Sequence, residues 1–195
     1  MGVPLDRLVL FTARNLVPRM GLENLLEAMA LVILKIPDAL LYIAGDGVLK
    51  EKLQSLIHEL KLEQSVKLLG YLSDEILVHY FQMGDFFILP TIDLEGFGLV
   101  TVESMACGVP VLGTPIGGTQ EILGRLDKSL LFENTTPEAI ARLILEKYKI
   151  YISHPEQYQK LSFNCRRFVE ENYSWTKNID ETIRTFSQCA ASAEK

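Results

Sequence analysis

The stretch "FFILPTIDLEGFGLVTVESMACGVPVLGT", residues 86–114, changes its character twice along its length. It begins with an apolar run of strand length at 86–89 and ends with a second one at 110–114. Between these runs, the residues from about Gly98 to Cys107 have the pattern of a helix. An apolar strand, a helix and a second apolar strand predict two parallel strands joined by a crossover helix.

The same alternation extends outward from this unit in both directions. Further apolar runs of strand length occupy residues 7–13, 39–45, 65–70 and 129–133. Helical patterns occupy residues 21–36, 48–62 and 73–84, the last with Ser73 as a capping residue, and a helix begins at Thr136. Strands that are apolar throughout are typical of a parallel sheet covered on both faces. The sequence therefore predicts a doubly wound, Rossmann-like α/β fold, followed by a helical tail from about residue 153 in which Trp175 packs on the core.

Length and composition narrow the class of protein. The 195 residues, 48% hydrophobic and 23% charged, fit one folded domain spanning residues 1–195. A net charge of −6 argues against a general nucleic-acid binder. The three cysteines form neither a metal-binding nor a disulfide pattern, and no signal peptide or apolar segment of membrane-spanning length is visible. We therefore expect a soluble protein of the reducing cytoplasm.

The loop after the 86–89 strand is the first candidate site, because ligands of such sheets bind beyond the carboxyl ends of the strands. Gly96 and Gly98 stand where this loop gives way to a helix, and glycines let the backbone approach a ligand closely. The free N–H groups of Phe97, Gly98 and Leu99 at the helix start could donate to a phosphate.

Two acids, Glu95 and Glu103, bracket this helix start. Glu103 lies about one and a half turns into the helix, or roughly 7 Å along it. Helical side chains lean toward the N-terminus, so its carboxylate could accept hydrogen bonds from paired hydroxyls, as on a ribose. Glu95 would then face whatever lies beyond the phosphates. The alternative is that Glu95 ends a loop and Glu103 faces solvent.

Other strand-end loops add further candidates. Arg14 and Arg19 follow the first strand and could pair with a diphosphate, although surface ion pairs explain them equally well. Gly45 follows the second strand, in a tight turn that could approach a ligand, although a structural turn is the favoured interpretation. The pair Gly117 and Gly118 either opens a short helix or forms a second wall of the pocket.

Several other chemistries lack their motifs. His58, His79 and His154 are scattered over predicted helices, without a metal-ligand or nucleophile–base arrangement. Neither the GxxxxGK[ST] phosphate-binding loop nor a GxGxxG fingerprint after the first strand occurs. The sequence therefore disfavours P-loop ATP hydrolysis and hydride transfer.

Taken together, "FTARNLVPRMGLENLLEA", "YIAGDG" and "EGFGLVTVESMACGVPVLGTPIGGTQEIL" resemble the C-terminal, donor-binding half of a GT-B fold, family 4 (group 1) retaining glycosyltransferase. The resemblance covers nearly the whole chain. It implies a nucleotide-sugar donor such as a UDP- or GDP-sugar, and transfer of the sugar with retention of configuration. It also implies no tightly bound metal and no other cofactor.

The resemblance assigns roles residue by residue. Arg14 would stabilise the diphosphate leaving group and Glu95 would contact the donor sugar, which makes these two the catalytic candidates. Glu103 would hold the ribose, and Tyr71 and Leu72 would border the base. The backbone of residues 96–99 would lie near the sugar and the phosphates, and Arg19 and Gly45 complete the donor-binding set.

The chain departs from the family in two respects. The family commonly has a lysine where this chain has Met20, and the adjacent Arg19 is the candidate replacement. The N-terminal domain that binds the acceptor in the family is absent, so we expect a donor-binding fragment that is inactive alone. The acceptor, a glycan, lipid or small molecule, and any peripheral contact with the inner membrane face would then depend on the full-length protein. The helix after Trp175 often crosses back to that domain in the family.

Two other interpretations remain open at this stage. One is a GT-B-like epimerase or phosphorylase, because a fold does not determine a reaction. The other is a non-catalytic module that binds nucleotide sugars; Met20 favours it slightly, whereas Arg14, Glu95 and Glu103 oppose it.

Overall fold

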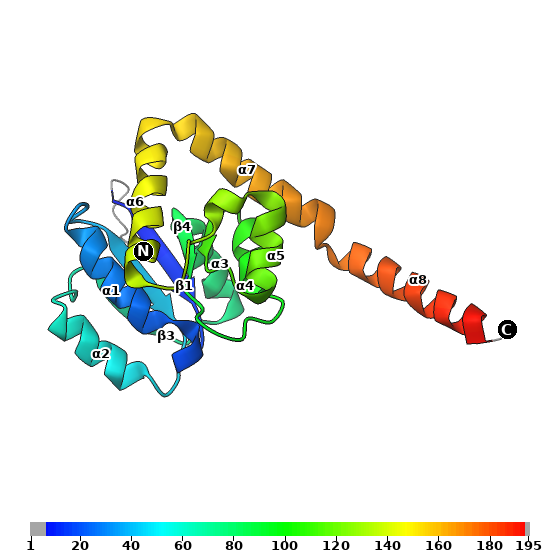
Figure 1. Cartoon of the computed structure of the whole chain (residues 1–195), viewed down its shortest axis with the longest axis horizontal. Coiled ribbons are helices and arrows are strands. Elements are labelled where there is room, and N and C mark those ends of the chain that lie inside the picture. The colour runs from blue at the N-terminus through cyan, green and yellow to red at the C-terminus, as the bar shows by residue number, and fades with distance from the viewer. Residues whose placement is uncertain (1–6, 194–195) are drawn as a thin grey trace.

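A single parallel sheet forms the centre of the molecule (Figure 1), as seen in a computed structural model that describes residues 7–193. Its strands are β1 (Val9–Ala13), β2 (Leu40–Ala44), β3 (Val66–Gly70), β4 (Phe86–Leu89) and β5 (Val111–Gly113). They are ordered β3-β2-β1-β4-β5, and each neighbouring pair is parallel. The predicted doubly wound parallel sheet is confirmed.

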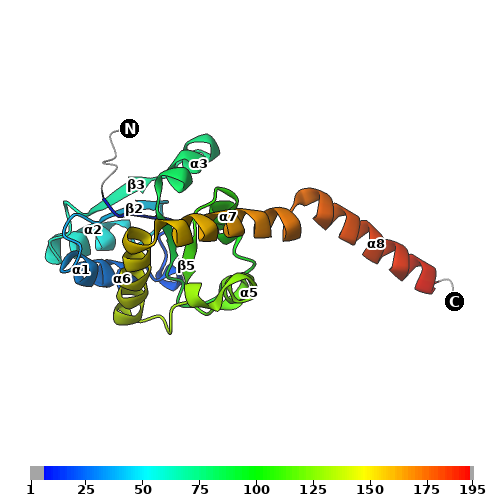
Figure 2. The same cartoon turned by 90° about the horizontal axis from the view of Figure 1, so that it is seen from above.

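Helices cover both faces of this sheet, with α1, α2 and α6 on one side and α3 and α4 on the other (Figure 2). Right-handed crossovers produce this division, because the chain reverses its direction across the sheet after β3. The helices are α1 (Leu22–Ile33), α2 (Lys50–Glu59), α3 (Asp74–Met83), α4 (Leu99–Ala106), α5 (Gly117–Leu126), α6 (Pro137–Ser153), α7 (Pro155–Asn172) and α8 (Trp175–Ala193), with 3₁₀ turns η1 (Pro18–Met20) and η2 (Lys128–Leu130).

The apolar spacing of α1 explains how the helices dock. Leu22, Leu25, Leu26 and Met29 recur every three or four residues, and each of them is fully buried. Burial of a side chain of this size stabilises the folded state by about 1.5–3 kcal/mol. The face predicted from the sequence is therefore the face that packs into the domain.

The strand order creates one place suited to ligand binding. The direction of winding reverses between β1 and β4, which makes this the topological switch point of the sheet. Arg14 directly follows β1, and the 90–98 loop follows β4. The fold therefore brings the first and fourth strand-end loops together.

Two local predictions differ from the structure. The strand predicted at 129–133 is wrong, because only Leu131 forms a bridge, with Gly113. The preceding residues coil into η2, where the Asp127 carboxylate accepts a hydrogen bond from the Ser129 N–H. Ser73 does occupy the N-cap position of α3, but its side chain makes no capping hydrogen bond.

The helical tail consists of two parts that behave differently. Helix α7 packs against α4, whereas α8 extends away from the domain (Figures 1 and 2). Trp175, the first residue of α8, is 81% exposed, so the prediction that it anchors the tail on the core is wrong. The reason is the break between the two helices at Tyr173 and Ser174, after which every side chain through residue 189 is exposed.

Candidate functional site

A cleft of about 310 Å³ opens at the switch point of the sheet. Four of the residues predicted for donor binding line it: Arg14, Gly45, Tyr71 and Leu72. The other lining residues are Ala13, Asn15, Met20, Ala44, Asp74, Leu77 and Val100. The cleft thus joins the ends of β1, β2 and β3 to the starts of α3 and α4.

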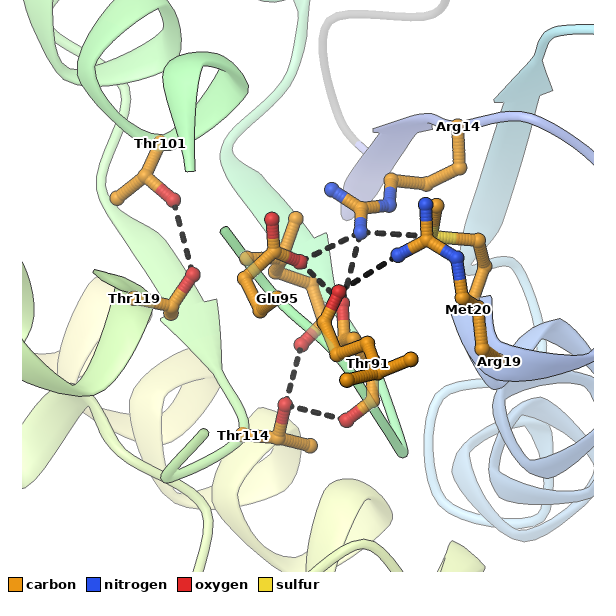
Figure 3. A network of polar contacts seen from close by, with 10 residues as sticks. Arg14, Arg19, Met20, Thr91, Glu95, Thr101, Thr114 and Thr119 are labelled. Atoms are coloured by element: carbon orange, nitrogen blue, oxygen red, sulfur yellow. Dashed lines mark hydrogen bonds and ion pairs between the residues drawn. The ribbon is translucent and has the colours of Figure 1, made fainter. Parts of the chain in front are cut away.

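Arg14 is the buried cation of this cleft, with only 5% of its side chain exposed. Its backbone N–H donates to the Ala44 carbonyl at 2.9 Å, which holds the residue beside β2. One guanidinium nitrogen, Nη2, donates to Met20 Sδ at 2.8 Å and to Thr91 Oγ1 at 2.8 Å (Figure 3). Its buried Nε has no hydrogen-bond partner among residues 7–193.

Glu95 is the acidic partner of this arginine. Its Oε2 lies 2.6 Å from Arg14 Nη2 and 2.7 Å from Thr91 Oγ1, and its side chain is 8% exposed (Figure 3). Glu95, predicted to contact the sugar, and Arg14, predicted to contact the diphosphate, therefore form a buried ion pair in this structure. Sequence reasoning missed this pairing, because 81 positions separate the two residues.

Thr91 joins the pair and was not identified from the sequence. It is fully buried, and its hydroxyl accepts from Arg14 and donates to Glu95. Its carbonyl accepts a 2.6 Å hydrogen bond from Thr114 Oγ1, which connects it to the end of β5. The sequence signal that could have identified Thr91 as a site residue is its position just beyond the carboxyl end of β4.

The glycine pair of α5 supports the loop that carries Glu95. The Gly118 N–H donates to the Gly96 carbonyl at 2.9 Å. A Cβ added at Gly118 would lie 2.2 Å from the Phe97 carbonyl oxygen, and one at Gly117 would lie 2.0 Å from that of Glu95. The pair therefore opens a helix and buttresses the loop, and neither glycine lines the cleft.

A second contact holds the same loop from the tail. The Phe97 ring meets Tyr173 edge-to-face, with the ring centroids 5.7 Å apart. The Arg125 guanidinium lies over the Tyr173 ring at 5.9 Å and donates to its hydroxyl. The turn between α7 and α8 thus contacts the glycine-rich loop.

Helix α4 begins where the sequence placed it. Gly98 caps the helix with a φ of 81°, a conformation that favours glycine, and Leu99 is the first helical residue. The side chain of Leu99 is 62% exposed. The first N–H groups of a helix have no partner within it, so this end of α4 offers free donors beside the Glu95 loop.

Glu103 of α4 does not line the cleft, but its carboxylate lies close enough to that of Asp74 in α3 to be influenced by its charge. Partial burial raises the pKa of Glu103 above its ordinary value, and the negative charge of Asp74 raises it further. Asp74 lines the cleft, but sequence reasoning did not identify it as a site residue.

Arg19 and Met20 are neighbours in η1 but contact different partners. Met20 is 6% exposed, and its sulfur accepts from Arg14. Arg19 Nη1 instead donates to the Leu94 carbonyl at 2.7 Å, which ties η1 to the loop before Glu95 (Figure 3). A contact of Arg19 with a diphosphate stays a prediction.

The described residues contain neither a metal-ligand cluster nor a helix of membrane-spanning character. Among residues 7–193, no group of three or more His, Cys, Asp or Glu side chains is arranged to hold a metal ion. Within the same residues, no helix is both long and apolar enough to cross a membrane.

Comparison with known proteins identifies relatives of this arrangement. Residues 2–167 match the family described as "Glycosyl transferases group 1". A mannosyltransferase of Corynebacterium glutamicum, named as GDP-mannose-dependent and acting on a monoacylated phosphatidylinositol monomannoside, is 32% identical over 167 residues. That match covers 83% of this chain and 42% of the mannosyltransferase.

Solved structures share the fold. Sucrose-phosphate synthase from Thermosynechococcus elongatus matches with a TM-score of 0.83 and 25% identity, over 97% of this chain and 47% of that one. HepE of Anabaena, solved with UDP and glucose, matches with a TM-score of 0.80 and 22% identity, over 93% of this chain and 48% of that one. The chain therefore spans a little under half the length of each of these three relatives.

Proposed function

The chain belongs to the group 1 glycosyltransferases, and we propose that its cleft binds a nucleoside-diphosphate sugar. The observation that carries this proposal is Arg14, a buried guanidinium that lines the cleft at the switch point and keeps one unpartnered N–H at Nε. A guanidinium held at the carboxyl end of a parallel strand is suited to pair with the anionic oxygens of a ligand in that cleft.

The remaining donor contacts belong to the same proposal. The start of α4, at Gly98 and Leu99, offers N–H groups to the phosphates, together with the positive end of the helix dipole. Glu103 holds the ribose hydroxyls, and Tyr71 and Leu72 border the base. Positive charge from the arginine and the helix would neutralise the leaving diphosphate, a role that needs no tightly bound metal.

Glu95 is the proposed contact to the donor sugar. Its Oε2 is occupied by Arg14 and Thr91, whereas its Oε1 has no hydrogen bond to a described residue. The second oxygen is therefore available to accept from a sugar hydroxyl while the ion pair persists. Equally, a diphosphate that draws Arg14 away would release the whole carboxylate.

Catalysis in this proposal requires an acceptor domain in addition to this chain. The donor sugar would pass to a glycan, lipid or small-molecule acceptor with retention of configuration. Helix α8 supports the two-domain arrangement, because Trp175, Ile179, Ile183 and Phe186 form an exposed apolar stripe at helical spacing. Docking on the acceptor domain would cover this stripe.

A thermal-melting screen against UDP-, GDP- and ADP-sugars tests donor binding. A ligand that binds only the folded state raises the melting temperature, by about 3–6 °C at ten times its dissociation constant for a domain of this size. Absence of a shift with each of these donors would overturn the proposal.

Two variants separate the proposed roles of the acids. Glu103→Ala should weaken nucleotide and nucleotide sugar alike, by about tenfold or 1.4 kcal/mol, because both ligands carry the ribose. Glu95→Ala should remove only the additional affinity that the sugar provides. If the wild-type chain binds nucleotide and nucleotide sugar equally, the role of Glu95 is wrong.

A further inference from the structure

A second cavity, of about 220 Å³, lies between α6, α7 and the amino end of β4. It shares no lining residue with the donor cleft. Phe86, which lines it, is the first residue of β4, whereas the Glu95 loop follows the last. The lining residues are Phe86, Asp127, Ser129, Lys147, Ile150, Tyr151, Gln157, Tyr158 and Leu161.

Lys147 is the unusual member of this set. It is only 7% exposed, and its ammonium donates to Ser129 Oγ at 2.8 Å. No carboxylate of the described residues lies within 4.0 Å of this nitrogen. An ammonium has three N–H donors, so the single neutral partner leaves two of them unused. A buried charge without a counter-charge is costly, which points to an anion as the missing partner.

Aromatic side chains form firm walls beside this lysine. The rings of Tyr151 and Tyr158 meet edge-to-face with centroids 4.8 Å apart, and the Phe86 ring lies 5.5 Å from that of Tyr158. The Tyr158 hydroxyl donates to the Asp85 carbonyl at 2.8 Å. Burial and a hydrogen bond to Asp85 raise the pKa of Tyr151 to about 12, so this hydroxyl stays protonated. Asp85 thus anchors the Tyr158 ring through its carbonyl.

The polar residues limit what the cavity accepts. Asp127 also lines it, and its Oδ1 accepts from the Ser129 N–H at 2.9 Å. Ser129 is therefore hydrogen-bonded both to this carboxylate and to Lys147. Gln157 adds an amide that can donate or accept. A bare anion would use only part of this lining, whereas an anionic group on a compact ring would also contact the aromatic walls.

We propose that this cavity binds a small molecule that carries an oxyanion, a phosphate or a carboxylate, on a compact apolar or aromatic body. Lys147 and Ser129 bind the oxyanion, and Tyr151, Tyr158 and Phe86 contact the body. The site is separate from the donor cleft and does not depend on the function proposed for that cleft.

Melting experiments test the site with inorganic phosphate and phenyl phosphate as probes, each compared with chloride at matched ionic strength. We expect both probes to raise the melting temperature of the wild-type chain, by about 3–6 °C at ten times the dissociation constant. Phenyl phosphate should act at lower concentration than phosphate, because its ring contacts the walls. Phenol alone should have little effect.

Matched variants on one helix locate the effect. Lys147→Met keeps the apolar stem and removes the charge, so it should remove most of the shift with both probes. Lys149→Met, at an exposed position of α6, should preserve the shift. A melting transition in chloride verifies that each variant folds.

A titration of the isotope-labelled wild-type chain gives a readout that requires no variant. Phosphate should move the amide resonances of Ser129 and Gln157 and leave those of Tyr71 and Leu72 in place. The proposal is overturned if neither probe binds, if Lys147→Met retains the full shift, or if only donor-cleft resonances move. A negative donor screen would leave this result unaffected, so the two proposals fail separately.

Discussion

Thr91 is the side chain on which Arg14 and Glu95 converge. Its hydroxyl accepts from one and donates to the other, in a fully buried position. Because one hydroxyl orients both charges, the alignment of the ion pair depends on an atom that neither charged residue supplies. We therefore expect Thr91 to act as a positioning residue for both.

Thr91→Val tests this dependence, since it keeps the shape and removes the hydroxyl. The free energy of unfolding should fall by about 1–3 kcal/mol, because hydrogen bonds to two charged groups are lost. Nucleotide-sugar affinity should fall as well. Chemical denaturation and calorimetric titration measure the two effects. Thr91→Ser restores the hydroxyl and should recover most of the affinity; equal losses in both variants would refute a positioning role.

Glu103 provides a pH-dependent prediction. Its pKa is raised by burial and by Asp74, so its carboxylate becomes protonated at a higher pH than an ordinary glutamate. The ionised form accepts hydrogen bonds from ribose hydroxyls, so nucleotide-sugar affinity should fall as the pH drops from neutrality through this raised pKa. Asp74→Asn removes the neighbouring negative charge and should move the fall to lower pH. Nucleotide-sugar affinities measured across this pH range test the prediction. If the pH midpoint of the fall is unchanged in Asp74→Asn, Asp74 does not influence the pKa of Glu103.

At the scale of elements, α5 and the 94–98 loop form one unit. The first two residues of α5 pack so closely on the loop backbone that they leave no room for a Cβ. The loop conformation that presents Glu95 therefore depends on a helix that contributes no side chain to the cleft.

Gly118→Ala should displace this loop, because the added Cβ would lie 2.2 Å from the Phe97 carbonyl oxygen. Overpacking of this kind costs about 1–3 kcal/mol of stability, and we expect nucleotide-sugar binding to weaken with it. Gly124→Ala is the matched control in the same helix, because nothing lies within 4 Å of its added Cβ. It should stabilise the chain by about 0.5–1 kcal/mol. Thermal melting of both variants measures this difference in stability. If Gly118→Ala is as stable as Gly124→Ala, the loop adjusts to the added Cβ and the prediction is wrong.

At the scale of the whole molecule, α8 stands apart from the domain. The side chains of residues 175–189 are exposed, and the helix extends away from the sheet (Figure 1). Removal of residues 175–195 should therefore leave the melting temperature and nucleotide-sugar affinity of the domain nearly unchanged. In a protein that also carries an acceptor domain, the same truncation should reduce sugar transfer. A large fall in the melting temperature of the isolated chain would show that α8 packs on the domain.

The sequence predicted the sheet and most of its helices, because the spacing of apolar residues indicates which side chains are buried on folding. It failed at 129–133, where the start of an apolar run forms a 3₁₀ turn capped by the Asp127 side chain instead of a strand. It failed at Trp175 for a related reason. A large aromatic residue signals burial, but the sequence does not say whether its partner lies within the same domain.

For the candidate site, the sequence by itself determined the residue types and their placement at strand ends, because local glycine, capping and strand signals act over a few positions. Arg14, Gly45, Tyr71 and Leu72 do line one cleft. Only the tertiary structure decided that Arg14 pairs with Glu95 through Thr91, and that Gly117 and Gly118 hold the loop from behind. These contacts join residues far apart in the chain, and their geometry depends on strand order and packing, which no local pattern encodes.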